Sequence, residues 1–218
     1  MLPIVIFGPV GVGKSTIVQT LGKRIADALV ISEPVDALIS SGALDAVYQN
    51  RPGSALTLQM LVLSERIASY WRAMAVAANT KPGVIIMDGY YDLDLHIFCD
   101  EHMRAERLTA SERQCMQTAE EMISSAELVP RQLRNPVLYF YLTASALTCA
   151  VRSDIRGRTE ETALDISWFE RNCKDCDAVA RSLIPRTKLV TIDAEIHLDR
   201  VVNMILDVIS TIRKNSGQ

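Results

Sequence analysis

A glycine-rich segment near the start of the chain has the residue types and spacing of a phosphate-binding loop. Gly8, Gly11 and Gly13 precede Lys14 and Ser15, so the segment reads G-x-x-x-x-G-K-S. Glycines let consecutive backbone N–H groups turn toward a phosphate, and a helix that begins at the loop adds partial positive charge. Lys14 would reach the β- and γ-phosphates, and the Ser15 hydroxyl would bind Mg²⁺. The motif predicts a nucleoside triphosphate and Mg²⁺ but not the phosphate acceptor.

Three arginines later in the chain could stabilise a phosphoryl group during transfer. Arg152 and Arg156 are four residues apart and share one face of a predicted helix, which Gly157 ends before Arg158. Guanidinium groups directed at one point suit the charge on the equatorial oxygens of a transferring phosphoryl group. The alternative is a solvated basic helix end that complements the helix dipole. Because the chain also has a P-loop, we interpret residues 152–161 as a catalytic lid.

Five short apolar segments alternate with helical patterns. The predicted strands are Leu2–Phe7, Leu29–Ser32, Val84–Met87, Val137–Leu142 and Lys188–Ile192. The predicted helices are Lys14–Ala28, Ser54–Ala78, Ala110–Leu128, Ala144–Asp154, Ile166–Ile184 and His197–Arg213. Residues 35–52 are less regular, and we expect a helix with a mobile end there. Apolar strands separated by helices predict an α/β fold, a five-stranded parallel sheet covered by helices on both faces. No repeat or linker divides the chain, so we expect a single domain over residues 1–218.

Acidic residues follow three of the predicted strands. Glu33 comes after the second strand, Asp88 after the third and Asp193 after the fifth. Ligands of such folds bind at the carboxyl ends of the strands. We therefore expect these three side chains to converge on the triphosphate site.

Composition limits the class of protein. The 218 residues are 49% hydrophobic and 22% charged, with a net charge of -3, which argues against a nucleic-acid duplex as the main partner. No apolar stretch approaches the roughly 18 residues that span a bilayer, and the first residues lack signal-peptide features, so we expect no membrane association. Five cysteines are not a disulfide framework, and the pair Cys173 and Cys176 lacks partners for a zinc site. We predict a cytoplasmic or nuclear protein, with the cytoplasm as the first choice.

Six segments in order make nearly the whole chain resemble the deoxynucleoside kinase family. They are GPVGVGKST, ISEPV, LTLQMLVLSER, IIMDGYYDLD, RSDIRGRTEE and VTIDA. The resemblance implies a P-loop kinase fold that uses ATP and Mg²⁺ to phosphorylate the 5′-hydroxyl of a deoxynucleoside. It also implies a homodimer built from long helices beside the acceptor site, and residues 54–78 are apolar enough for that role.

The resemblance assigns roles around the reacting groups. Glu33 matches the general base, which suits a primary alcohol that needs a proton acceptor within hydrogen-bond reach. Asp88 matches the acidic residue beside the metal, and Ser15 matches the second residue at the metal. Tyr48 and Glu161 match the pair that holds the sugar 3′-hydroxyl. The remaining matches to the ATP site and to transfer are Gly8, Gly11, Gly13, Lys14, Thr16, Arg152, Arg156, Arg158 and Asp193.

The resemblance also indicates where the nucleobase binds. Gln59 matches the residue that reads the base, and its carboxamide offers both an acceptor and a donor to a base edge. Arg66 and Asp94 match positions that set base preference, where a charged pair favours deoxycytidine or a deoxypurine over thymidine. The alternative for this pair is a structural ion pair at the rim of the site.

One departure from the family pattern keeps other functions open. Gly89 stands where an Arg usually follows the acidic residue, and Tyr90 stands where Ser is common. A positive φ at the strand end would explain the glycine. One alternative function is a thymidylate-type kinase for nucleoside monophosphates, against which the Glu33-Pro34 pair argues. The other is a catalytically impaired nucleotide-binding protein or switch, although no N-K-x-D-like segment supports a switch.

Overall fold

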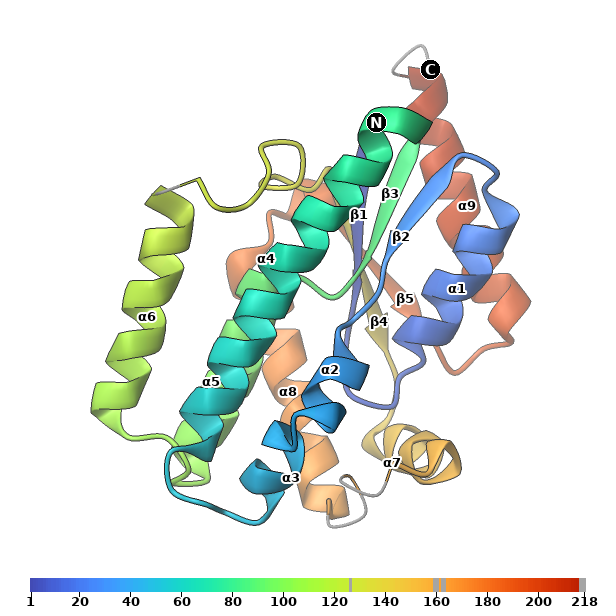
Figure 1. Ribbon diagram of the computed structural model, residues 1–218. Coiled ribbons are helices and arrows are strands. Elements are labelled where there is room, and N and C mark those ends of the chain that lie inside the picture. Colours follow the sequence, from blue (N-terminus) through green and yellow to red (C-terminus); the bar gives the residue numbers. More distant parts are fainter. Residues whose placement is uncertain (126, 159–160, 162–163, 216–218) are drawn as a thin grey trace.

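Five parallel strands form the centre of the molecule. The computed structural model describes residues 1–125, 127–158, 161 and 164–215. The sheet has the order β2-β3-β1-β4-β5 (Figure 1). The strands are β1 (Leu2–Phe7), β2 (Ala28–Ile31), β3 (Val84–Asp88), β4 (Leu138–Thr143) and β5 (Leu189–Asp193). The predicted sheet is confirmed, and each strand lies within one residue of its predicted bounds.

Six helices occupy the predicted segments. They are α1 (Lys14–Arg24), α4 (Ser54–Thr80), α6 (Ala110–Ser125), α7 (Ala146–Arg156), α8 (Ile166–Leu183) and α9 (Leu198–Asn215). Residues 35–52 contain two short helices, α2 (Val35–Ser40) and α3 (Ala43–Tyr48), instead of the single helix expected. A 3₁₀ turn, η2 (Arg186–Lys188), precedes β5.

One long helix, α5 (Tyr91–Arg104), was not predicted. Its buried residues include Leu93, Leu95, Ile97 and Cys99, which alternate in the sequence as those of a strand do. A helix that buries more than one face lacks the single apolar stripe by which a surface helix is recognised. The sequence pattern therefore concealed the element that follows Asp88.

Alternate residues of β1 build the two halves of the core. Ile4 and Ile6 pack in a cluster with residues of α1 and α9, whereas Val5 and Phe7 pack in a cluster with residues of α4, α5, α6 and α8. Figure 1 shows α1 and α9 on one side of the sheet and α4, α5 and α6 on the other. Side chains of a strand alternate between its two faces, so both faces of the central strand are buried.

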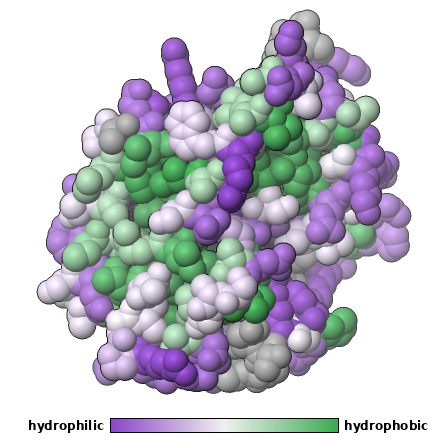
Figure 2. All heavy atoms as spheres, in the orientation of Figure 1, coloured by the Kyte–Doolittle hydropathy of each residue, from purple (hydrophilic) through white to green (hydrophobic). Residues whose placement is uncertain are grey.

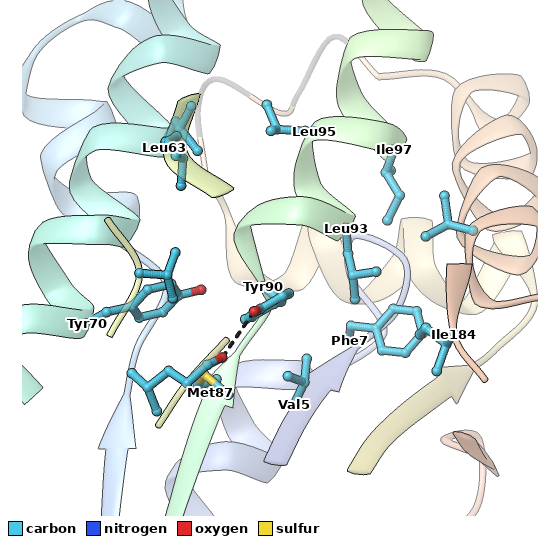
Figure 3. Close-up of a cluster of buried hydrophobic side chains, with 14 of the residues drawn as sticks. Val5, Phe7, Leu63, Tyr70, Met87, Tyr90, Leu93, Leu95, Ile97 and Ile184 are labelled. Atoms are coloured by element: carbon cyan, nitrogen blue, oxygen red, sulfur yellow. Dashed lines mark hydrogen bonds between the residues drawn. The ribbon is translucent and has the colours of Figure 1, made fainter. Parts of the chain in front are cut away.

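Tyrosine side chains fix the start of α5 against α4 and the sheet. The rings of Tyr70 and Tyr90 are stacked with their centroids 6.2 Å apart, and Figure 3 shows both beside Val5 and Met87. The Tyr90 hydroxyl lies 3.0 Å from the carbonyl oxygens of Leu133 and Arg134, to which it can donate. Tyr90, which replaces the usual serine, is therefore a buried structural anchor.

The surface seen from the side of α4 is mixed in character. Hydrophobic areas lie between hydrophilic ones in Figure 2. The large hydrophobic residues that α4 exposes are Met60, Trp71 and Val76. In the part of the chain that the structure describes, no helix combines the length and the apolar character needed to cross a membrane.

Candidate active site

The P-loop has the backbone geometry that its glycines allow. Gly11 and Gly13 have φ values of 81° and 106°. A β-carbon at Gly11 would lie 2.1 Å from the carbonyl oxygen of Cys149, so the loop packs directly against α7. Lys14 begins α1, and its Nζ donates to the carbonyl oxygen of Gly8 at 2.9 Å. The loop is thus held in an open turn above the first residues of a helix, as phosphate binding requires.

A first cavity lies over this loop and suits the phosphate donor. Its lining includes residues 11–17 together with Glu33, Arg152, Ile155, Arg156, Arg158, Ala194, Ile196, Leu198 and Val201. Arg152 Nη1 donates to the carbonyl oxygen of Val12 at 2.8 Å, and its Nη2 donates to that of Ala194 at 2.9 Å. Arg152 therefore joins the P-loop to the loop after β5, and Thr16 lines the same cavity as predicted.

The structure does not bring Asp193 into that cavity. In the order β2-β3-β1-β4-β5, β5 forms the edge opposite to β2, whereas Glu33 follows β2 and Asp88 ends the neighbouring strand β3. The Asp193 carboxylate accepts a hydrogen bond from the backbone N–H of Glu195 at 2.8 Å. Asp193 therefore lies on the edge strand, next to Ala194 of the donor cavity, and its carboxylate shapes the loop after that strand.

A second cavity adjoins the first and is enclosed by helices. Its apolar wall comes from β1 and from helices α2 to α5, and includes Phe7, Leu38, Val47, Leu58, Leu93, Ile97 and Phe98. The predicted residues that line it are Gly8, Lys14, Glu33, Tyr48, Gln59, Asp94, Arg156, Arg158 and Glu161. An apolar cavity with a few converging polar groups is the usual form of a small-molecule site.

Four residues belong to both cavities. Lys14, Glu33, Arg156 and Arg158 line the first and also the second. A carboxylate and three cationic side chains thus stand where a molecule in one cavity would meet a molecule in the other. This shared wall is the place where group transfer between two bound molecules can occur.

The carboxylate of Asp88 is buried at this junction. Only 2% of Asp88 is exposed, and its Oδ1 has no hydrogen-bond partner among the described residues. Burial and the nearby Glu33 raise the pKa of Asp88, whereas Lys14 and the Ser15 hydroxyl oppose that rise. Carboxylate and hydroxyl oxygens are suitable ligands for Mg²⁺, so Asp88 and Ser15 fit the predicted metal site.

Arg66 is fully buried behind the second cavity. Its Nε donates to Asp94 Oδ2 at 2.9 Å, and its Nη1 donates to the backbone carbonyl oxygen of Asp88. Its Nη2 lies 3.9 Å from Glu33 Oε1. Burial raises the pKa of Asp94 to about 6, although Arg66 opposes this. Asp94 lines the cavity and Arg66 supports it from behind, so the pair lies deep in the site and not at its rim.

Gln59 stands on the long helix α4 at the same cavity. It is 2% exposed, and its Oε1 has no hydrogen-bond partner in the described part of the chain. An unpaired buried carboxamide oxygen is costly, and a ligand donor in the cavity would satisfy it. This supports the predicted role of Gln59 in contacting a base edge.

The lid residues contact one another across the end of α7. Gly157 ends α7 with a φ of 70°, as its sequence position predicted. Arg156 Nη2 donates to Glu161 Oε2, and Arg158 Nη1 lies 3.2 Å from Glu161 Oε1. Burial works against the ionised form of Glu161, but hydrogen bonds from Ser153 and Arg156 hold its pKa below the usual value. Thr159 and Glu160 of the predicted lid lie outside the described residues.

Besides the apolar wall, the lining residues of the second cavity that sequence reasoning missed include Phe98, Glu101, His102, Arg107 and Trp168. Three of them belong to α5, the helix that the alternating pattern concealed. The spacing of Leu93, Ile97 and Glu101, four residues apart, is the signal that would have placed Glu101 on the cavity side of a helix.

Comparisons with known proteins identify the family and the fold. The family model described as deoxynucleoside kinase matches residues 4–215. A solved structure of deoxyadenosine kinase from M. mycoides, with the products dCMP and a flexible dCDP, is similar with a TM-score of 0.78 and 21% identity; 96% of this chain and 100% of that chain are covered. The same enzyme with dATP gives a TM-score of 0.73, and with dCTP 0.75, each at 20% identity and the same coverage. No curated protein matches significantly.

Proposed function

Because this chain belongs to the deoxynucleoside kinase family, we propose that it transfers the γ-phosphoryl group of ATP to the 5′-hydroxyl of a deoxynucleoside. The observation that carries the proposal is the wall of four residues common to both cavities. ATP would occupy the cavity over the P-loop, and the nucleoside would occupy the apolar cavity. Their reacting ends would then meet beside Glu33.

Each residue of the shared wall has a task in this reaction. Glu33 accepts the proton of the 5′-hydroxyl while the 5′-oxygen of the nucleoside bonds to the γ-phosphorus. The bond from that phosphorus to the β–γ bridging oxygen breaks at the same time. Lys14 and the lid arginines stabilise the charge that spreads over the phosphoryl oxygens. Asp88 and Ser15 would hold Mg²⁺, which neutralises phosphate charge when it is bound.

For the acceptor, we propose deoxycytidine or a deoxypurine in preference to thymidine. Gln59 Oε1 and the Asp94 carboxylate both accept hydrogen bonds, which suits the exocyclic amine that cytosine carries at C4, adenine at C6 and guanine at C2. Thymine has carbonyl oxygens at C2 and C4 and no exocyclic amine, so it has no such donor for these two acceptors. The M. mycoides relative was solved with cytidine and adenosine deoxynucleotides, which is consistent with this choice.

A product assay tests the function directly. The protein is incubated with Mg²⁺ and ATP and with each deoxynucleoside or its monophosphate, and products are separated by charge. We expect monophosphates from deoxycytidine or the deoxypurines, and a requirement for Mg²⁺. Products formed only from monophosphates would indicate a thymidylate-type kinase, and no product from any acceptor would indicate a binding protein.

We also propose a homodimer formed through α4. The exposed Met60, Trp71 and Val76 give this helix an apolar surface that a second copy would cover. Light scattering coupled to size exclusion tests this, because a monomer at micromolar concentration contradicts it. A cytoplasmic location stays a prediction.

A further inference from the structure

One side chain of α8 reaches the first turn of the P-loop. Asn172 Oδ1 accepts a hydrogen bond from the backbone N–H of Val10 at 2.9 Å, although 162 positions separate the two residues in the sequence. Asn172 is 1% exposed. Trp168 and Cys176, one turn before it and one turn after it, line the acceptor cavity, as does Val10. Residues four apart share a face of a helix, so Asn172 stands in the middle of the face of α8 that borders this cavity and the loop.

One half of the Asn172 carboxamide has no partner among the described residues. Its Oδ1 is paired with Val10, whereas its Nδ2 is buried without a hydrogen-bond partner in that part of the chain. A buried amide group without a partner lowers the stability of the folded protein. Leucine has the same branched shape and would fill this space without that cost. The asparagine is therefore better explained by what its oxygen holds than by packing.

This hydrogen bond holds one side of a single peptide unit, and Lys14 holds the other side. The carbonyl of Pro9 and the N–H of Val10 belong to the same peptide bond, which is planar and, like the other described peptide bonds, not cis. In such a unit the carbonyl and the N–H point in opposite directions. Lys14 Nζ donates to the Pro9 carbonyl oxygen at 3.0 Å. Asn172 and Lys14 thus fix the plane of this peptide from its two sides.

The two contacts differ in what a bound nucleotide would do to them. Lys14 lines both cavities, and the lysine of a P-loop binds the β- and γ-phosphates. An ammonium group that turns to the phosphates leaves the carbonyl oxygens of Gly8 and Pro9, to which it donates in this structure. Asn172 lines neither cavity in the described part of the chain, so a nucleotide does not compete for its oxygen.

We propose that Asn172 is a positioning residue for the phosphate donor, because it keeps the Pro9–Val10 peptide in place after Lys14 has moved to the phosphates. The lining of the donor cavity begins at Gly11, the residue after Val10. The N–H of Val10, directed at α8, therefore fixes where the chain enters the run of N–H groups that would surround the phosphates. This inference rests on the proposed function, because it places a nucleoside triphosphate over the loop.

Two replacements of Asn172 separate the hydrogen bond from packing. Asn172→Leu keeps the branched shape and removes the oxygen, whereas Asn172→Ala also removes the volume. Calorimetry measures the Kd of a non-hydrolysable ATP analogue with Mg²⁺ and the Kd of a deoxynucleoside. We expect both variants to raise the Kd of the analogue about 10-fold, as the loss of one hydrogen bond would, and to leave that of the deoxynucleoside unchanged.

Urea denaturation of the same variants measures the structural effect. Asn172→Ala should lower the free energy of unfolding more than Asn172→Leu, because it leaves a cavity. Val179→Ala is the matched control, since Val179 lies on the same helix and is buried in the core away from the loop. It should lose stability and keep the wild-type Kd for the analogue.

Several outcomes would overturn the inference. A wild-type Kd for the analogue in Asn172→Leu would show that packing alone suffices. Equal weakening of both ligands, or weaker binding of the analogue in Val179→Ala as well, would show a general structural role. These measurements concern binding, so a wild-type protein that binds the analogue but phosphorylates no nucleoside would contradict the proposed function and leave the test of Asn172 intact. A wild-type protein that does not bind the analogue would refute both.

Discussion

A β-carbon at Gly89 would lie 2.4 Å from Nη2 of Arg66. Gly89 also has a φ of 80°, so a side chain there would be both strained and obstructed. Arg66 reaches this point from α4 and donates to the backbone of Asp88. The guanidinium of Arg66 therefore occupies the space into which a side chain at position 89 would extend.

We predict that Gly89→Arg destabilises the protein and does not accelerate the reaction. Gly89→Ala should lower the free energy of unfolding more than Gly42→Ala, and urea denaturation measures both. Gly42 is the control because it has a φ of 71° but no atom within 4 Å of an added β-carbon. Backbone strain of this kind costs about 1–3 kcal/mol, and the contact with Arg66 adds to it. Equal losses at the two positions would show that Arg66 moves aside freely.

Glu33→Gln should remove most of the turnover and leave nucleoside binding intact. The amide keeps the size of the side chain but cannot accept the 5′-hydroxyl proton, and general-base catalysis is worth about 10² to 10⁴ in rate. Steady-state kcat and calorimetric Kd for the nucleoside measure the two effects. A kcat close to that of the wild type would refute the assignment of Glu33.

The double change Arg66→Met with Asp94→Ala should shift relative kcat/KM toward thymidine. Both partners are replaced together because a single replacement would leave one buried charge unpaired, which typically costs about 3–5 kcal/mol. The assay compares thymidine with deoxycytidine and the deoxypurines as competing acceptors. A wild-type protein that prefers thymidine would contradict the proposed role of Arg66 and Asp94 in base preference.

Stability should fall as pH rises from about 4.5 toward 7 because of a cluster on α5 and α6. Burial and the neighbouring Asp92 raise the pKa of Glu120 from 4.5 to about 7, so the folded protein binds more protons than the unfolded chain in this range. The pKa of His96 is also raised, chiefly by its hydrogen bond to Asp92, and that contribution is lost as pH rises through the folded-state pKa. The pKa of Asp92 is lowered, so its contribution to stability is lost as pH falls below the usual pKa of 3.8.

Thermal unfolding between pH 5 and pH 8 measures this dependence. Glu120→Gln should flatten the profile relative to the wild type, because the amide does not titrate. Glu121→Gln, at the adjacent exposed position, is the control and should leave the slope unchanged. A wild-type Tm that rises steadily over this range would contradict the prediction.

Local signals in the sequence predicted the sheet and the turn of the P-loop into a helix. The P-loop, the strands and the glycine that ends α7 depend on neighbouring residues, so short motifs reveal them. The position of Arg66 does not depend on neighbouring residues. It follows from the packing of α4 against a strand end 22 residues away in the sequence, which no short motif reveals. Likewise, the place of Glu101 follows from the helical form of α5, and the place of Asp193 on the edge strand follows from a strand order that no local pattern reveals.

The shared wall has a consequence for how the two ligands bind. Arg156 and Arg158 are paired with Glu161 on the acceptor side, yet both also face the donor cavity. A donor nucleotide that attracts these guanidinium groups changes the charge that Glu161 offers to a nucleoside. Thermodynamic linkage then requires each ligand to alter the affinity of the other by the same factor. Donor and acceptor would thus bind cooperatively. Nucleoside affinity measured with and without a non-hydrolysable ATP analogue gives the factor by which one ligand changes the affinity of the other. A factor of one would mean that the two cavities fill independently.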